Sequence, residues 1–159
     1  MQTTLRNSWF QTVVTGLLSL AMVISANAAN VHLVGDPIIQ DTGENLDVCF
    51  KLAGLGNKDI TVSLAITGTA TVLYYNPASN FPPGQNKVPV KSISFKTVPA
   101  TEIKNGTVTV CIESADVIVP PAPNPNWIVD IVDVSFDTAT ITVTQKGKTV
   151  LNQTFDLDN

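Results

Sequence analysis

Residue types on which many common functions depend are scarce in this chain of 159 residues. It contains one arginine, Arg6, one histidine, His32, and two cysteines, and only 14% of its residues are charged. Acidic residues outnumber basic ones by thirteen to nine, so the composition does not suggest the basic face that binds nucleic acid. A single histidine excludes metal sites that are built from several histidines.

The groups that common enzymes use are missing as well. His32 is expected to face solvent in a short strand, although a serine triad would need it as the base. No Gly-x-Ser-x-Gly elbow is present to supply a nucleophile, and the glycine turn at residues 54–57 lacks the remainder of a phosphate-binding pattern. The sequence therefore predicts no catalytic residue, no cofactor and no enzyme activity.

The densest group of carboxylates is Asp130, Asp133 and Asp137. In a strand, Asp133 and Asp137 would lie about 13 Å apart, which exceeds the spacing that glycoside hydrolysis requires. Asp130 alternates in step with the apolar Val132, Val134 and Phe136, so a regular strand would place all four side chains on the same face. Asp130 is therefore either a buried acid or next to a bulge in the strand. A calcium site formed with loop carbonyls is an alternative to a solvated acidic face, and we assign no metal ligand.

The chain also has no apolar run long enough to cross a membrane. The longest, residues 13–24, contains about twelve residues, whereas a membrane span needs about twenty. A short polar start with Arg6 precedes this run, and Ala26 and Ala28 follow it in a small-x-small pattern. This order is typical of a secretory signal peptide that is cleaved after Ala28.

We therefore expect a signal peptide over residues 1–28 and one mature domain over residues 29–159. The mature chain would be secreted or periplasmic, with no membrane span after cleavage. It keeps all thirteen acidic residues, and its basic residues are all lysines.

Strand signals dominate the remaining sequence, and helix signals are nearly absent. Ile60, Val62 and Leu64 alternate with polar or small residues, as in a half-buried strand. Gly68 permits a bend or bulge, and residues 70–74 continue the same phase. Further runs of this kind lie at residues 31–39, 46–52, 92–96, 107–112, 127–136 and 141–155.

Seven or eight strands separated by turn residues predict an all-β, antiparallel β-sandwich of immunoglobulin-like proportions, with a β-barrel as the alternative. Two longer segments, Asn76–Pro89 and Pro120–Asn126, are rich in proline and are expected to lie off the sheets. The aromatic residues near these segments are candidate binding residues, because aromatic side chains at loop edges stack on sugars or on a partner's prolines. They are Tyr74, Tyr75, Phe81 and Trp127. The alternative for each is a place in the core.

The two cysteines, Cys49 and Cys111, are predicted to form a disulfide, because an exported chain folds in an oxidising compartment. Each lies between two apolar residues of an alternating strand, so both should point away from the core. Two outward cysteines can join only if their strands are neighbours in one sheet. This arrangement differs from the core-crossing disulfide of antibody domains.

The stretch Phe50–Asn57, with its AGLGN turn, and the strand residues 60–62 and 67–72 resemble a group of small exported bacterial β-proteins. Those proteins also have a threonine-rich strand, an Asn/Pro/Gly loop and a later proline-rich loop, and the likeness covers most of residues 46–144. The resemblance implies an exported β-protein and no particular activity. Related chains place their cysteines in the two loops, near Tyr75 and residues 124–125, whereas this chain has them on strands.

Two hypotheses for the function follow. The first is a non-catalytic binding module that contacts a glycan or a protein through the two loops and their aromatic residues. The alternative is a structural subunit of a surface assembly or fibre, in which the segment Asn30–Gln40 adds to a neighbour's sheet edge. Pro37 counts against strand addition, because proline cannot donate a backbone hydrogen bond.

Overall fold

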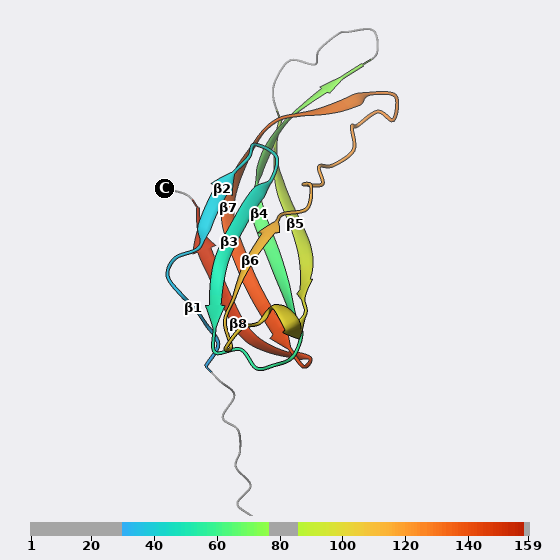
Figure 1. Cartoon of the computed structure of the whole chain (residues 1–159). Helices are drawn as coiled ribbons and strands as arrows, with labels where there is room; N and C mark the ends of the chain where they lie inside the picture. Colours follow the sequence, from blue (N-terminus) through green and yellow to red (C-terminus); the bar gives the residue numbers. More distant parts are fainter. Residues whose placement is uncertain (1–29, 77–85, 158–159) are drawn as a thin grey trace, which may run out of the picture.

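A computed structural model of the chain describes residues 30–76 and 86–157 (Figure 1). These residues form eight strands and one short 3-10 turn. They are β1 (His32–Leu33), β2 (Ile38–Asp41), β3 (Leu46–Ala53), β4 (Ile60–Tyr75), β5 (Asn86–Val98), η1 (Ala100–Glu102), β6 (Val108–Glu113), β7 (Ile128–Gln145) and β8 (Lys148–Asp156). The expected signal segment, residues 1–28, lies outside the described residues.

The strands form two antiparallel sheets of four strands each, so the prediction of an all-β sandwich is confirmed and the closed barrel is excluded. In sheet A, β3 pairs with β6 on one side and with β1 and β2 on the other. Sheet B has the order β5-β4-β7-β8. Figure 1 shows the two layers facing each other along most of their length.

The core lies between the sheets and follows the alternation of the sequence. In β4, every second residue from Ile60 to Tyr74 is buried, including Gly68. The facing strand β3 buries Leu46, Val48, Phe50 and Leu52 in the same way. Burying these apolar side chains against each other supplies the main driving force for folding.

The predicted irregularity at Gly68 is confirmed, and its counterpart is in β7. Thr67 pairs with Thr138, but Gly68 pairs with Phe136, so Asp137 is an extra residue in β7. A Cβ atom on Gly68 would collide with the carbonyl oxygen of Ser135, and it would lie 3.1 Å from the Cα atom of Phe136. Glycine is therefore required here because the two backbones approach closely.

A second extra residue in β7, Val132, decides between the two interpretations of Asp130. The bulge shifts the alternation, so that Val129 and Ile131 turn towards the core and Asp130 is exposed. The strand-bulge interpretation is confirmed, and the buried acid is wrong.

Two expectations for β5 are wrong. The sequence predicts that Asn76–Pro89 lies off the sheets, but its last four residues, Asn86–Pro89, pair with β4. Pro89 is tolerated because β5 is an edge strand of its sheet. The alternation also predicts that Ile93 and Phe95 are buried, whereas they are 51% and 67% exposed. The polar residues that alternate with them, Ser92, Ser94 and Lys96, pair with the inward residues of β4 and face inward.

Candidate functional site

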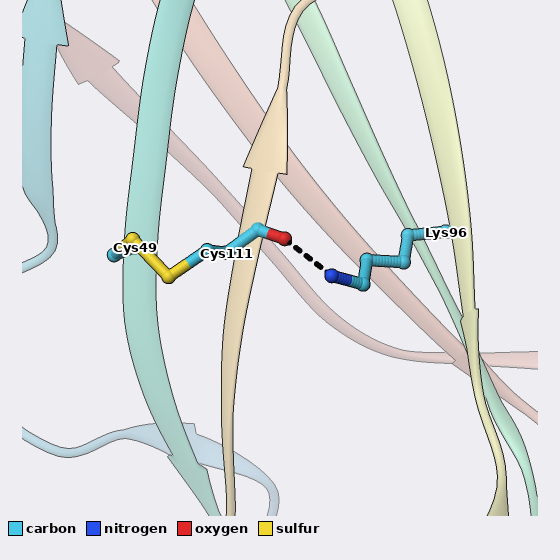
Figure 2. The surroundings of a disulfide bond; sticks show 3 residues. All are labelled: Cys49, Lys96 and Cys111. Atoms are coloured by element: carbon cyan, nitrogen blue, oxygen red, sulfur yellow. Dashed lines mark hydrogen bonds between the residues drawn. A yellow bond between two sulfur atoms is a disulfide. The ribbon is translucent and has the colours of Figure 1, made fainter.

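The predicted disulfide is present and joins neighbouring strands of sheet A, as the alternation required. Cys49 on β3 lies directly opposite Cys111 on β6, with their Cα atoms 4.0 Å apart. Their neighbours Val48 and Ile112 point into the core, so the cystine lies on the outer face of the sheet (Figure 2). The sulfur chemistry of the described residues is therefore a structural crosslink.

Three side chains of β5, in sheet B, form hydrogen bonds to backbone carbonyl oxygens at and just after β6, in sheet A. The hydroxyl groups of Ser92 and Ser94 donate to the carbonyl oxygens of Ala115 and Glu113, both at 2.7 Å. The ammonium group of Lys96 donates to the carbonyl oxygen of Cys111 at 2.8 Å, as Figure 2 shows. We call these three contacts the seam.

The seam explains why β5 reverses the expected alternation. Its inward residues face the edge of β6, where carbonyl oxygens need donors, and apolar side chains could not supply them. The side chains take the place of a backbone ladder between β5 and β6. The two sheets are joined there without closing into a barrel.

At one end of the molecule, β4 and β7 continue beyond the other strands as a two-stranded arm, which Figure 1 shows projecting from the sandwich. The last described pair between β4 and β5 is Val72 with Asn86. The next three residues of β4 pair only with β7 among the described strands, ending with Tyr75 opposite Ile128. Within the described ranges 30–76 and 86–157, the arm is therefore narrower than the sheet from which it extends.

The segment between β6 and β7, residues 114–127, contacts the inner side of the arm at Tyr74, and we call it the strap. Its Val117 is buried, and Val119, Ala122 and Trp127 are half-buried against the core. Pro120–Asn126 lies off the sheets, as predicted. The phenol oxygen of Tyr74 lies 3.5 Å from the carbonyl oxygen of Pro120, which links the arm to the strap.

Hydrogen bonds fix both ends of the strap. At its start, the backbone amide of Leu46 donates to the hydroxyl of the buried Ser114 at 3.0 Å, and Ser114 donates its own amide to the Leu46 carbonyl at 2.8 Å. At its end, the Asn124 side chain accepts from the amide of Asn126, and its carbonyl accepts from Trp127. This turn sets the position at which β7 begins.

The structure places three of the four candidate binding aromatics at this end of the molecule. Tyr74 faces inward and is only 8% exposed, which leaves little of its ring for a ligand. Tyr75 is half-buried on the opposite, outer face, and Trp127 is half-buried beside the start of β7. Phe81 lies outside the described residues.

Sequence reasoning missed two surface residues here, Ile128 and Val132. They are 47% and 49% exposed. The region 127–136 has apolar residues at both odd and even positions. This pattern alone does not show which of its side chains face outward. The arm and its base therefore expose apolar side chains next to the acidic Asp130 and Asp133.

The remaining candidates do not form a chemical centre. His32 is exposed in β1, and its Nδ1 atom lies 2.7 Å from the carbonyl oxygen of Asn30. Within residues 30–76 and 86–157, no group of three or more His, Cys, Asp or Glu side chains is arranged to hold a metal ion. Asp130 and Asp133 are exposed, and Asp137 is half-buried at the bulge.

No family model, no curated protein and no solved structure matches this chain. Among the described residues, no helix has the length and apolar character to span a membrane.

Proposed function

We propose that this protein is an exported, non-catalytic binding module that contacts a glycan or a protein partner with the outer face of its arm. The observation that carries the proposal is the construction of the arm. Its outer face presents Leu73, Tyr75 and Ile128. Its inner face contacts the strap through Tyr74. A surface that is held in place before binding loses less conformational entropy when the partner arrives.

The cystine supports the exported part of the proposal. Disulfides persist in oxidising compartments and are rare in reducing ones. The segment 1–28 supplies the expected signal peptide, and the resemblance to small exported bacterial β-proteins agrees with it. The proposal predicts that the mature protein begins at Ala29, which intact mass measurement on the exported protein would test.

The structure gives less support to the alternative, a fibre subunit that works by strand addition. The expected donor, Asn30–Gln40, already pairs with β3 of its own chain, through β1 and β2. Release of this segment would break the pairing along a whole side of β3. A donor strand would also need an accepting edge on the neighbouring molecule.

The edge strands β5, β8 and β1–β2 each carry a feature that hinders such pairing. β5 contains Pro89 and meets β6 through the seam. β8 has an extra residue, Val150, that breaks its regular register, and the β1–β2 edge is interrupted between Leu33 and Ile38. Proline, bulges and short strands are the devices with which natural proteins protect sheet edges. These edges favour a module that does not polymerise through its strands.

The binding proposal is tested with a glycan array and an array of surface-exposed proteins, using purified mature protein and the variants Tyr75→Ala and Ile128→Ser. We expect either substitution to weaken binding to any ligand found by at least about ten-fold, because anchors near the centre of an interface dominate its affinity. The matched control is Ile38→Ser, which alters an exposed isoleucine on the outer face of sheet A. Wild-type affinity in both arm variants would refute the proposed site.

A further inference from the structure

Strand β7 is longer than its neighbour β8 and is paired on one side only where β8 has ended. The ladder between β7 and β8 runs from Gln145 to Thr138. One more hydrogen bond follows it, from the backbone amide of Leu157 to the carbonyl oxygen of Asp137 at 2.9 Å. Beyond this point, residues 133–136 pair with β4 in regular register. Within residues 30–76 and 86–157, no backbone group pairs with their other side, which we call the β7 edge.

The β7 edge has the properties of a strand that can accept another strand. In a strand with one neighbour, every second backbone N–H and C=O group points to the unpaired side, where an extended peptide can hydrogen bond to it. Residues 133–136 contain neither proline nor lysine, which protect other sheet edges. The extra residues Val132 and Asp137 lie on either side of this stretch, so they limit its length but do not interrupt it.

Two pockets open beside the β7 edge. The first has a volume of about 220 Å³ and is lined by Ile39, Asp41, Leu46, Phe136 and Leu157. Leu46 and Phe136 belong to the core, so this pocket reaches the core from the open side of the sandwich. A dry protein cavity of about 150 Å³ is large enough to bind benzene. The pocket can therefore receive an apolar side chain.

The second pocket has a volume of about 440 Å³ and lies between the β2–β3 turn, residues 42–45, and residues Val132 and Asp133 of β7. Each pocket thus has one wall from the β2–β3 region of sheet A and the other wall from β7. Figure 1 shows β2 and the end of β8 on this side of the molecule. The two pockets together form a groove along the β7 edge.

The rim of this groove is acidic. Asp41, Glu44 and Asp133 line the pockets and are exposed, and none of them has an ion-pair partner among the described residues. Asp41 accepts a hydrogen bond from the amide of Gly43 at 2.8 Å, which holds its carboxylate at the turn. Lys87 is two strands away from Asp133 across the sheet. The groove therefore favours a partner that brings positive charge.

We propose that the β7 edge accepts an extended, basic segment of a partner protein, which adds to sheet B as an antiparallel strand in line with β8. Residues opposite each other in a sheet share a face, and Val134 and Phe136 face the core. The partner residues opposite these two are therefore apolar and enter the groove. A lysine or arginine follows opposite Asp133. Along the partner chain, the expected pattern is apolar, any residue, apolar, basic.

The charges select a different protein over a second copy of this chain. Two copies joined through the β7 edge would bring their acidic rims together, and like charges across an interface oppose association. The segment Asn30–Gln40 does not fit either, because it contains Asp36 and neither lysine nor arginine. This site goes beyond the function proposed for the arm. It uses the backbone of residues 133–136, whereas the arm presents side chains of residues 73, 75 and 128.

Fluorescence anisotropy with the purified mature protein and a short labelled peptide, in which valine alternates with threonine and lysine, tests the proposal. We expect saturable binding with a dissociation constant below about 1 mM. N-methylation of every second peptide amide removes the donors on one side of the peptide strand. One phase of methylation should abolish binding, and the other phase should retain it. The same peptide with glutamate in place of lysine should not bind.

Variants of the protein test the acidic rim. Glu44→Lys and Asp133→Lys should each weaken peptide binding at least about five-fold, because each puts a positive charge beside the peptide's lysines. The matched control is Glu102→Lys, which makes the same change at an exposed acid of η1, at the opposite end of the molecule (Figure 1). Tyr75→Ala should leave the peptide affinity unchanged, so failure of the β7 edge is distinguished from failure of the arm.

Hydrogen exchange measured by mass spectrometry gives the location of the bound peptide. Exchange should slow in residues 133–136 when the peptide is added and stay unchanged in β6. Three results would overturn the proposal: no binding up to about 1 mM peptide, equal binding of both methylated peptides, or protection outside the groove. Slow exchange at the β7 edge in concentrated protein without peptide would also overturn it, and would assign the edge to a second copy of the chain.

Discussion

Removal of the cystine offers a sharp test of how this sandwich is held together. The crosslink joins residues that are 62 positions apart in the chain. In the chain-entropy model, closing a loop of that length lowers the entropy of the unfolded chain enough to stabilise the fold by about 4 kcal/mol. Cys49→Ala combined with Cys111→Ala should therefore lower the free energy of unfolding by up to about 4 kcal/mol.

The variant should remain folded under native conditions. β3 and β6 keep the rest of their pairing, and the seam continues to attach β6 to β5. A domain of this size is typically stable by about 5–15 kcal/mol, so such a loss is large but survivable. Urea unfolding followed by Trp127 fluorescence would give the midpoint and the slope for both proteins.

The control replaces the next cross-strand pair on the same outer face, Lys51→Ala with Thr109→Ala. These side chains are exposed and form no covalent link, so each substitution should cost no more than about 0.5 kcal/mol. The reduced wild type should match the cysteine-free variant. If the cysteine-free variant lost less than about 1 kcal/mol, constraint of the unfolded state would not be the main role of the crosslink.

Two further predictions concern single contacts. Gly68→Ala should destabilise the protein by about 1–3 kcal/mol, because the added methyl group collides with the β7 backbone. Thermal unfolding would measure this loss, with Thr69→Ala, whose side chain points outward from the same strand, as the control. Equal unfolding midpoints for the two variants would show that β7 moves aside freely. Ser114→Ala should lower the free energy of unfolding by about 1–3 kcal/mol, because the buried amide of Leu46 loses its acceptor. Urea unfolding would measure this loss, with Ser135→Ala at an exposed position as the control. Equal losses in the two variants would contradict this role for the Ser114 hydroxyl.

The sequence predicted what local alternation determines. The inward residues of β3 and β4 were identifiable because each strand is regular and faces the apolar core. The outward direction of Cys49 and Cys111 followed from the same alternation, and it required their strands to be adjacent. One local property thus predicted a contact between residues far apart in the chain.

The sequence could not predict features that depend on the neighbouring strand. Val132 and Asp137 have no partner residue in the register between β7 and β4. At each of them the inward–outward alternation of β7 shifts by one residue, and the sequence of β7 alone does not indicate where. Apolar alternation suggested that Phe95 is buried, because nothing local showed that the inner face of β5 meets a strand edge. The arm escaped prediction for the same reason, since its outer face depends on where β5 begins.

The elements that hold this fold together also hold the arm in place. Cys111 is crosslinked to β3 and receives the Lys96 hydrogen bond on its carbonyl, so β6 is fixed on both sides. Three residues later, Ser114 begins the strap, which supports the inner face of the arm near Tyr74. Local openings in proteins start where few buried contacts hold a segment. Because the strap leaves β6 directly from its crosslinked part, the cystine opposes such opening at the base of the proposed binding surface.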